Sequence, residues 1–285
     1  MSFFHGMRSQ ILVAIVFLLG GAFSFGQPAE AVSIQLYAMD CGHFDFPDMG
    51  VFSDTGEYDH QPGSMADPCF LIHHPRGWLL WDTGFSDTFP GRPSGAASTG
   101  TVMYRSQPLI SELKTLHLSP AEIAYVGFSH LHCDHSGNAN LFLSSTWLLQ
   151  RKEFAFATAK PTPFGVDPGT FSNYQKAKLH LLDGDYDVFG DGTVRILAAP
   201  GHTPGHQVLL VKLRQKGFVI LSGDAFQLQQ NRRERLVPAY NSSRAETLAS
   251  MDRIEKLAKN LHATVIVQHS VEDSALLPAF PEAWQ

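Results

Sequence analysis

Four side chains that can bind a metal ion fall within six consecutive residues: His130, His132, Asp134 and His135, in the stretch SHLHCDHSGN. The apolar run IAYVGFS at residues 123–129 comes directly before them and is typical of a buried β-strand. Because strand ends meet at one edge of a sheet, side chains that follow a strand can meet residues distant in sequence. The cluster therefore predicts a fold in which several strands deliver ligands to one rim.

Three further candidate ligands also lie at strand ends. His202 follows the strand pattern at 193–200, Asp224 ends the run GFVILSGD, and His269 ends ATVIVQH. Histidine and aspartate without a clear cysteine ligand are typical of a hydrolytic metal site rather than a structural one. Seven ligands exceed the four that a tetrahedral zinc ion takes, so the sequence predicts two divalent ions that share a carboxylate. Two such ions would lower the pKa of a shared water and supply a hydroxide nucleophile at neutral pH.

Other residues near these patterns have plainer expected roles. His206, in GHTPGH, is expected to orient its neighbours. Cys133 is expected to be a filler that points away from the metals. Asp82 has two open interpretations, a turn residue or a buried carboxylate that accepts a hydrogen bond from the metal-binding loop. The chain has 14 histidines, and we expect no metal role for His5, His43, His60, His73, His74, His117, His180 and His262.

Strand patterns alternate with few helices along the chain. Apolar stretches predict strands at 32–39, 69–74, 77–84, 123–129, 145–150, 193–200, 206–213, 217–224 and 263–269. Residues 106–118 and 243–261 have apolar residues at helical spacing, the second with a serine at its start. This order indicates two packed sheets with helices outside.

The first 31 residues have the pattern of a secretory signal peptide. Arg8 precedes an apolar run at 11–23, and a small-residue stretch ends in Ala29-Glu30-Ala31. The run is shorter than the ~18–20 residues that span a bilayer. We therefore expect cleavage near Ala31, one hydrolase domain at 32–285, a periplasmic or secreted location, and no stable membrane insertion. In an oxidising compartment Cys41 and Cys69 could pair, although the sequence does not show that they approach.

Composition narrows the class of protein. The chain has 285 residues, 44% of them hydrophobic and 17% charged, which suits one large α/β domain with a sizeable core. The formal net charge is −6 and the basic residues form only one short run, Arg232, Arg233 and Arg235. This disfavours a nucleic-acid-binding surface.

The segments HLHCDH, PGHTPGH, SGDA and QH together resemble the metallo-β-lactamase superfamily, over about residues 33–275. The resemblance implies a four-layer αββα sandwich with a dinuclear metal site at one edge. It assigns His130, His132 and His202 to the first metal, and Asp134, His135 and His269 to the second. Asp224 would bridge the two metals, and Asp134 would also carry a proton to the leaving group, so these two aspartates are the expected catalytic residues. Zinc is the expected metal; iron, cobalt or manganese could take the same ligands.

Within the superfamily the chain is most similar to N-acyl homoserine lactonases, through WDTG, LLQRKEF and APGHTPGHQVLLV. This implies that a metal-bridging hydroxide attacks the lactone carbonyl and opens the ring. One position departs from that group, because Gln227 stands where related lactonases have a tyrosine. Either the Gln227 amide or Tyr240 could supply the missing hydrogen bond.

Two segments, 42–58 and 163–174, are expected to shape an apolar pocket for an acyl chain. They carry the aromatic residues Phe44, Phe46, Phe52, Phe164, Phe171 and Tyr174. The alternative is that these rings only fix the segments to the core. The expected partner is a small lactone with an acyl chain, and homodimer formation stays open.

Three other functions compete with the lactonase. A class B-like β-lactamase, or a hydrolase of other cyclic or aryl esters, would use the same fold, although the carboxylate of Asp224 disfavours the antibiotic-hydrolysing pattern. A thiolester hydrolase of the glyoxalase type would need a helical domain after His269, for which we expect no room. A non-catalytic metal-binding protein would keep the ligands without the activity.

Overall fold

The computed structural model describes Met1, residues 33–88 and residues 100–285. The predicted signal peptide, its cleavage site and the run after Arg8 therefore lie outside the described residues. None of the helices in the described part of the chain combines the length and the apolar character needed to cross a bilayer.

The first sheet pairs its strands in the order β13-β1-β2-β3-β5-β6-β7, and β4 pairs with β1. It has eight strands among the described residues: β1 (Gln35–Phe46), β2 (Gly63–His74), β3 (Gly77–Trp81), β4 (Val102–Tyr104), β5 (Ile123–Gly127), β6 (Thr146–Gln150), β7 (Lys178–Leu182) and β13 (Ala283–Trp284). From β3 to β7 the neighbouring strands are parallel, so their carboxyl ends lie at the same edge.

The second sheet pairs its strands in the order β12-β11-β10-β9-β8. Its strands are β8 (Tyr186–Asp187), β9 (Val194–Ala198), β10 (Gln207–Leu213), β11 (Gly217–Leu221) and β12 (Thr264–Ile266). The pair β11 and β12 is parallel, so the residues after both strands emerge at one edge.

The α-helices are α1 (Leu109–Thr115), α2 (Cys133–Ser136), α3 (Arg151–Ala157), α4 (Gln229–Glu234), α5 (Arg244–Leu261) and α6 (Val271–Ser274). Short 3-10 helices are η1 (Gly50–Phe52), η2 (Pro120–Glu122), η3 (Ala139–Leu141), η4 (Tyr174–Lys176) and η5 (Gly223–Ala225). The longest helix, α5, begins where the Ser243 side chain accepts a hydrogen bond from the Glu246 N–H. This is the N-cap that the sequence predicts.

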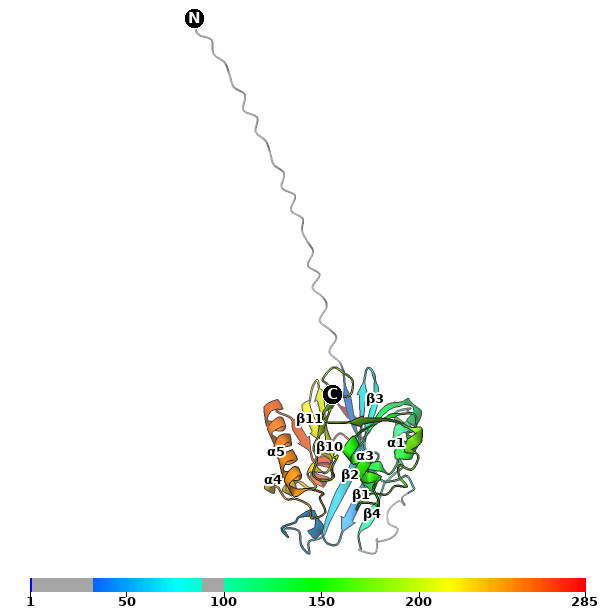
Figure 1. Ribbon diagram of the computed structural model, residues 1–285. Helices are drawn as coiled ribbons and strands as arrows, with labels where there is room; N and C mark the ends of the chain where they lie inside the picture. Colours follow the sequence, from blue (N-terminus) through cyan, green and yellow to red (C-terminus); the bar gives the residue numbers. More distant parts are fainter. Residues whose placement is uncertain (2–32, 89–99) are drawn as a thin grey trace. The chain divides into compact units, whose positions relative to one another are not determined.

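Alternation along the strands creates the layers. In β1, Leu36 packs in the core between the two sheets, whereas Tyr37 and Met39 pack in the core under α1. A third core lies under α5, where Met251 and Ile254 meet the outer face of the second sheet. Strands that are buried on both faces consist of continuous apolar runs, and this is why the sequence predicts them. The order helix, sheet, sheet, helix confirms the predicted αββα sandwich, with α5 beside β11 and α1 and α3 beside the first sheet (Figure 1).

The segment 42–58, predicted as a loop over the site, is partly a strand. Residues up to Phe46 continue β1 and pair with both β2 and β4. A β-bulge interrupts the pairing with β2 between Asp40 and His43. Such a bulge lets the strand bend and continue, although the Gly and Pro content of the segment suggests a loop. Beside the bulge, Cys41 and Cys69 form a disulfide with a Cα–Cα distance of 5.6 Å, so the two cysteines do approach one another.

Candidate functional site

The predicted ligands come from four segments, each of which follows a strand that ends at one edge of the two sheets. His130 and His132 follow β5, and α2 carries Asp134 and His135 immediately afterwards. His202 follows β9, Asp224 lies in η5 after β11, and His269 follows β12. The structure therefore brings all seven predicted residues together. This is expected, because residues that follow parallel strands emerge at the same edge of a sheet. Their coordination of metal stays a prediction.

The first group consists of His130, His132, His202 and Asp224, all buried, with ligand atoms within 4.8 Å of one another. His202 Nε2 lies 3.1 Å from His130 Nε2 and 3.1 Å from His132 Nδ1. The Oδ2 atom of Asp224 lies 3.2 Å from His202 Nε2. Three nitrogens and one oxygen that converge in this way suit a tetrahedral divalent ion.

The second group forms on the other oxygen of Asp224. Asp224 Oδ1 lies 3.1 Å from His135 Nε2 and 3.0 Å from His269 Nε2. The Oδ2 atom of Asp134 lies 3.7 and 3.8 Å from the same two nitrogens. One carboxylate oxygen of Asp224 thus faces each group, which is the arrangement of a bridging ligand.

Hydrogen bonds on the far side of three rings orient their near nitrogens toward the cluster. His202 Nδ1 donates to the Asn241 side chain, His269 Nδ1 donates to the Ala66 carbonyl, and His135 Nδ1 donates to Asp82. Each ring therefore directs its Nε2 at the cluster, and a bound metal would take the ring in its neutral form. His202 Nε2 and His130 Nε2 lie only 3.1 Å apart, so a cation between them would be favourable when neither nitrogen carries a proton.

Buried polar atoms that lack hydrogen bonds also favour a cation in the cluster. His135 Nε2 and Asp224 Oδ1 are buried and make no hydrogen bond of good geometry with the described residues, although they lie 3.1 Å apart. Burial, followed by neighbouring histidine rings, holds the pKa of both His130 and His132 well below the usual histidine value. Neutral imidazoles are the form that binds metal. The donor set and the orphaned atoms thus fit a divalent metal site.

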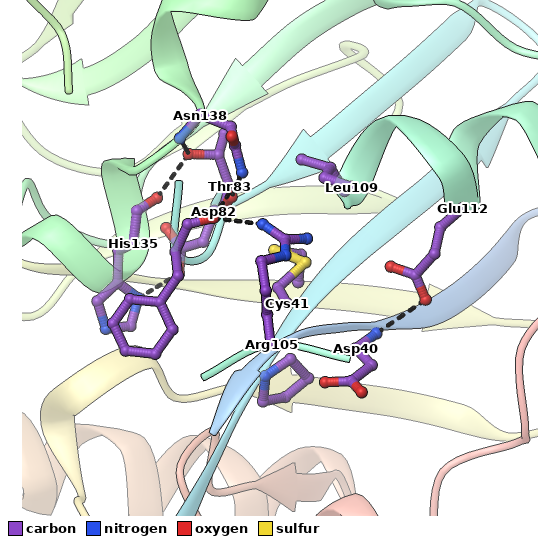
Figure 2. Close-up of a disulfide and its surroundings, with 12 residues drawn as sticks. Asp40, Cys41, Asp82, Thr83, Arg105, Leu109, Glu112, His135 and Asn138 are labelled. Carbon is purple, nitrogen blue, oxygen red and sulfur yellow. Dashed lines mark hydrogen bonds and ion pairs between the residues drawn. A yellow bond between two sulfur atoms is a disulfide. The ribbon is translucent and has the colours of Figure 1, made fainter. Parts of the chain in front are cut away.

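Of the two interpretations of Asp82, the buried carboxylate is confirmed, and the residue is not a plain turn residue. Its Oδ1 accepts a hydrogen bond from the Ser129 N–H at 2.6 Å. Its Oδ2 accepts from His135 Nδ1 at 2.9 Å, and both residues are labelled in Figure 2. The Gln268 amide donates to the same Oδ2 at 3.0 Å. Asp82 therefore fixes the tautomer and the orientation of His135.

His206 positions Asp224, as predicted. Its Nδ1 donates to the Ala199 carbonyl, and its Nε2 accepts from the Asp224 N–H at 2.9 Å. The Gln227 amide donates to Asp224 Oδ2 at 2.9 Å. Gln227 is thus engaged with the bridging carboxylate.

A cavity of ≈ 180 Å³ opens beside both groups. Its lining includes His132, Asp134, Asp224 and His269, together with apolar residues. The pocket interpretation is confirmed for Phe44, Phe46, Phe52 and Phe164, which line this cavity. It is wrong for Phe171 and Tyr174, which pack in the core under α1 because their segment turns back onto α3. Cys133 belongs to neither ligand group and lines the cavity.

Three residues beside the candidate site were not predicted from the sequence: Asp67, Asn241 and Gln268. Asn241 and Gln268 orient His202 and Asp82, and no local pattern marks them. Asp67 belongs with His135 and His269 in the second group. A buried-type strand with an aspartate in its middle, MADPCFLI, was the available signal for Asp67.

Residues 66–269 match the family model of the metallo-beta-lactamase superfamily. The chain belongs to this superfamily. The family model ends at His269 and spans every predicted ligand, so the superfamily prediction and its sandwich fold are confirmed.

Relatives within the superfamily are named for one activity. The N-acyl homoserine lactonase AttM of Azorhizobium caulinodans is 31% identical over 227 residues, which are 76% of this chain and 85% of AttM. AttM of Rhizobium radiobacter is 32% identical over 226 residues, 75% of this chain and 86% of the relative.

Solved structures show the same fold. A quorum-quenching N-acyl homoserine lactone hydrolase superposes with a TM-score of 0.77 at 24% identity, covering 88% of this chain and 98% of the other. A structure of that kind of hydrolase with N-hexanoyl-L-homoserine at its catalytic metal centre has a TM-score of 0.75 at 24% identity, covering 88% and 99%. The dizinc lactonase AidC has a TM-score of 0.65 at 17% identity, covering 88% and 90%.

Proposed function

We propose that this protein is a metal-dependent lactonase that opens the ring of N-acyl homoserine lactones. The observation that carries the proposal is the two-sided carboxylate of Asp224, with one oxygen facing three histidines and the other facing His135 and His269. This dinuclear arrangement opens onto an apolar cavity. The relatives named as N-acyl homoserine lactonases support the same substrate class.

The cavity suits a substrate with a polar head and an apolar tail. Phe44, Phe46, Phe52 and Phe164 supply aromatic surface, while Asp134 and His269 lie at the polar end. An acyl chain placed against the rings would be removed from water, at about 25 cal/mol per Å² of apolar surface buried. The same placement brings the lactone carbonyl to the ligand groups.

When bound, two divalent metals would lower the pKa of a water molecule and stabilise negative charge on the lactone carbonyl oxygen. The protein supplies the rest. His206 holds Asp224 by accepting a hydrogen bond from the Asp224 N–H. Gln227 holds it by donating a hydrogen bond to Asp224 Oδ2. Asp134 lines the cavity close to His135 and His269, where it can carry a proton to the departing ring oxygen.

Tyr240 provides a hydrogen-bond donor for the carbonyl oxygen in this proposal. Among the described residues that line the cavity, Tyr240 is the one with a hydroxyl group. Its ring centroid lies 5.6 Å from that of His202. Burial, together with Asp224 and Asp134, raises the pKa of Tyr240 well above its usual value. The phenol therefore keeps its proton and can donate it in a hydrogen bond, whereas Gln227 is already bound to Asp224.

Zinc is the proposed metal, because three imidazoles and a carboxylate suit it well. A periplasmic or secreted location is also part of the proposal. The disulfide between Cys41 and Cys69 supports it, since such bonds persist in oxidising compartments.

The test is proton release by the zinc-loaded protein, residues 32–285, with N-hexanoyl-L-homoserine lactone in weak buffer. Ring opening produces one carboxylate and releases one proton at neutral pH. We expect fast release that Asp224→Asn reduces by about a hundredfold or more, because the variant loses one bridging oxygen. Metal-free protein serves as the blank.

Two results would contradict the proposal. Turnover of β-lactams or aryl esters without lactone opening would replace the proposed substrate. Unchanged turnover in Asp224→Asn and in His202→Ala would refute the two-metal site itself.

A further inference from the structure

Asp67 lies in the middle of β2, at the point where the sheet is irregular. Asp40 pairs with Pro68 and His43 pairs with Ala66, so Cys41 and Gly42 together oppose Asp67. A bulge of this kind changes the direction in which a side chain points and is common next to active sites. On the other side, the Ala66 N–H donates to the His269 carbonyl, which joins this part of β2 to the ligand segment.

The Asp67 carboxylate is buried without a hydrogen bond. The residue is 1% exposed, and neither Oδ1 nor Oδ2 has a hydrogen-bond partner among the described residues. A Cβ atom on Gly42 would lie 3.0 Å from Asp67 Oδ2 and 2.3 Å from the Phe85 ring. Glycine at this position thus leaves room for the carboxylate. A buried carboxylate without hydrogen bonds is unfavourable unless a cation compensates it.

The cation position closest to Asp67 is the second ligand group. The Asp67 carboxylate and the ring nitrogens of His135 and His269 have ligand atoms within 4.8 Å of one another. The Nδ1 atoms of both rings donate to Asp82 and Ala66, and their Nε2 atoms face Asp224 Oδ1 at 3.1 and 3.0 Å. A positive ion between them would satisfy all three groups at once.

We propose that Asp67 is an additional carboxylate ligand of the second metal, beyond Asp134, His135, His269 and the bridging Asp224. The inference rests on the two-metal site of the proposed function. The first metal position would then be rich in imidazole and the second rich in carboxylate. The extra negative charge of Asp67 would strengthen retention of the second metal in particular.

A competing explanation is that water, not metal, satisfies Asp67. Asp67 also lines a cavity of ≈ 490 Å³ on the side of α1, together with Asp40 and Glu112. Glu112 is 1% exposed and has one carboxylate oxygen, Oε2, without a hydrogen-bond partner among the described residues. Its other oxygen accepts from the Asp40 N–H at 3.0 Å (Figure 2). Glu112 therefore shares the cavity and the burial of Asp67 but belongs to neither ligand group, which makes it a matched control.

The experiment compares metal binding by wild type, Asp67→Asn and Glu112→Gln. Metal-free protein is titrated with Zn²⁺ in competition with a chromophoric chelator, so that the two equivalents are measured separately. We expect Asp67→Asn to weaken the second equivalent about tenfold or more and to leave the first unchanged. Glu112→Gln should leave both unchanged. With Co²⁺, the visible absorption of the second equivalent should change in Asp67→Asn and not in Glu112→Gln, because a ligand has been lost.

Wild-type affinity for both equivalents in Asp67→Asn, with a wild-type Co²⁺ spectrum, would overturn the proposal. A loss of equal size in Glu112→Gln would also overturn it and favour the water-filled cavity. Asp67→Ser, which fits the same space, is measured in the same way and covers the case in which the asparagine variant does not fold. If wild type itself binds no second metal, the failure belongs to the proposed function rather than to Asp67.

Discussion

Asp82 has a left-handed backbone conformation, with φ 58°, and its carboxylate connects the Ser129 N–H, the His135 ring and the Gln268 amide. Asparagine tolerates this conformation nearly as well as aspartate. Substitution by asparagine therefore leaves the backbone in place and changes only the hydrogen bonding. This makes the position suitable for separating the role of a positioning residue from that of a ligand.

We predict that Asp82→Asn weakens the second metal by about 10–100-fold, because His135 loses the acceptor that fixes its tautomer. The first metal should be retained, since His130, His132 and His202 do not bond to Asp82. Competition titration measures both affinities. Equal weakening of the two metals would mean that Asp82 supports the whole loop and not His135 in particular.

Tyr240 and Gln227 are the two candidates for the donor that related lactonases supply with a tyrosine. Tyr240→Phe keeps the ring contacts with His202, Phe52 and Phe164 and removes only the hydroxyl. We predict a fall in kcat of about 10–100-fold with unchanged metal content, typical of losing one transition-state hydrogen bond.

Gln227→Ala is the comparison for this prediction, and we expect a modest effect on kcat. A thousandfold loss in Gln227→Ala with little change in Tyr240→Phe would reverse the two roles. Steady-state kinetics and metal analysis on the same samples distinguish these outcomes.

At the scale of elements, α5 covers the outer face of the second sheet and so supports the strands that end at His202, Asp224 and His269. Ile254 is 1% exposed and packs in the core under this helix. We predict that Ile254→Ala lowers the free energy of unfolding by about 2–5 kcal/mol, as for other buried large-to-small changes. Urea unfolding measures the loss.

Lys256→Ala is the control for α5, because Lys256 is exposed on the same helix and alanine favours helix. Its effect should stay within about 0.5 kcal/mol. Equal effects of the two substitutions would show that α5 is held by its own helix propensity and not by the core.

The same elements explain what the sequence could and could not predict. Strands β5, β11 and β12 were recognised from apolar runs, and the ligands were recognised because each follows such a run directly. Asp67 was missed because its orientation depends on a bulge that Cys41 and Gly42 create in the opposite strand. Phe171 was misassigned for a similar reason, since the later part of its segment packs in the core with residues of α3, whereas Phe164 near its start lines the cavity. Local patterns predict which residues lie on an element, whereas pairing irregularities and the path of a segment depend on distant residues.

At the scale of the whole molecule, two buried glutamates carry stability that depends on pH. Glu112 lies under β1 and Glu153, in α3, accepts hydrogen bonds from Leu131 and Thr203 on the two ligand loops. Burial raises the pKa of each to about 7 from an ordinary value of 4.5. Between pH 4.5 and 7 the folded protein therefore holds protons that the unfolded chain has already released. Their contribution to stability is complete below the lower pH and is lost as pH rises to about 7.

We predict that Glu112→Gln removes half of this effect, since glutamine keeps the acceptor for the Asp40 N–H and cannot ionise. Between pH 5 and pH 8, wild type should lose about 1–3 kcal/mol of unfolding free energy relative to the variant. Urea unfolding of metal-free protein at the two pH values measures the difference, and the titration of the histidine cluster cancels because both proteins contain it. A constant difference across this range would mean that Glu112 is ionised at both pH values, with water in the adjoining cavity solvating its charge.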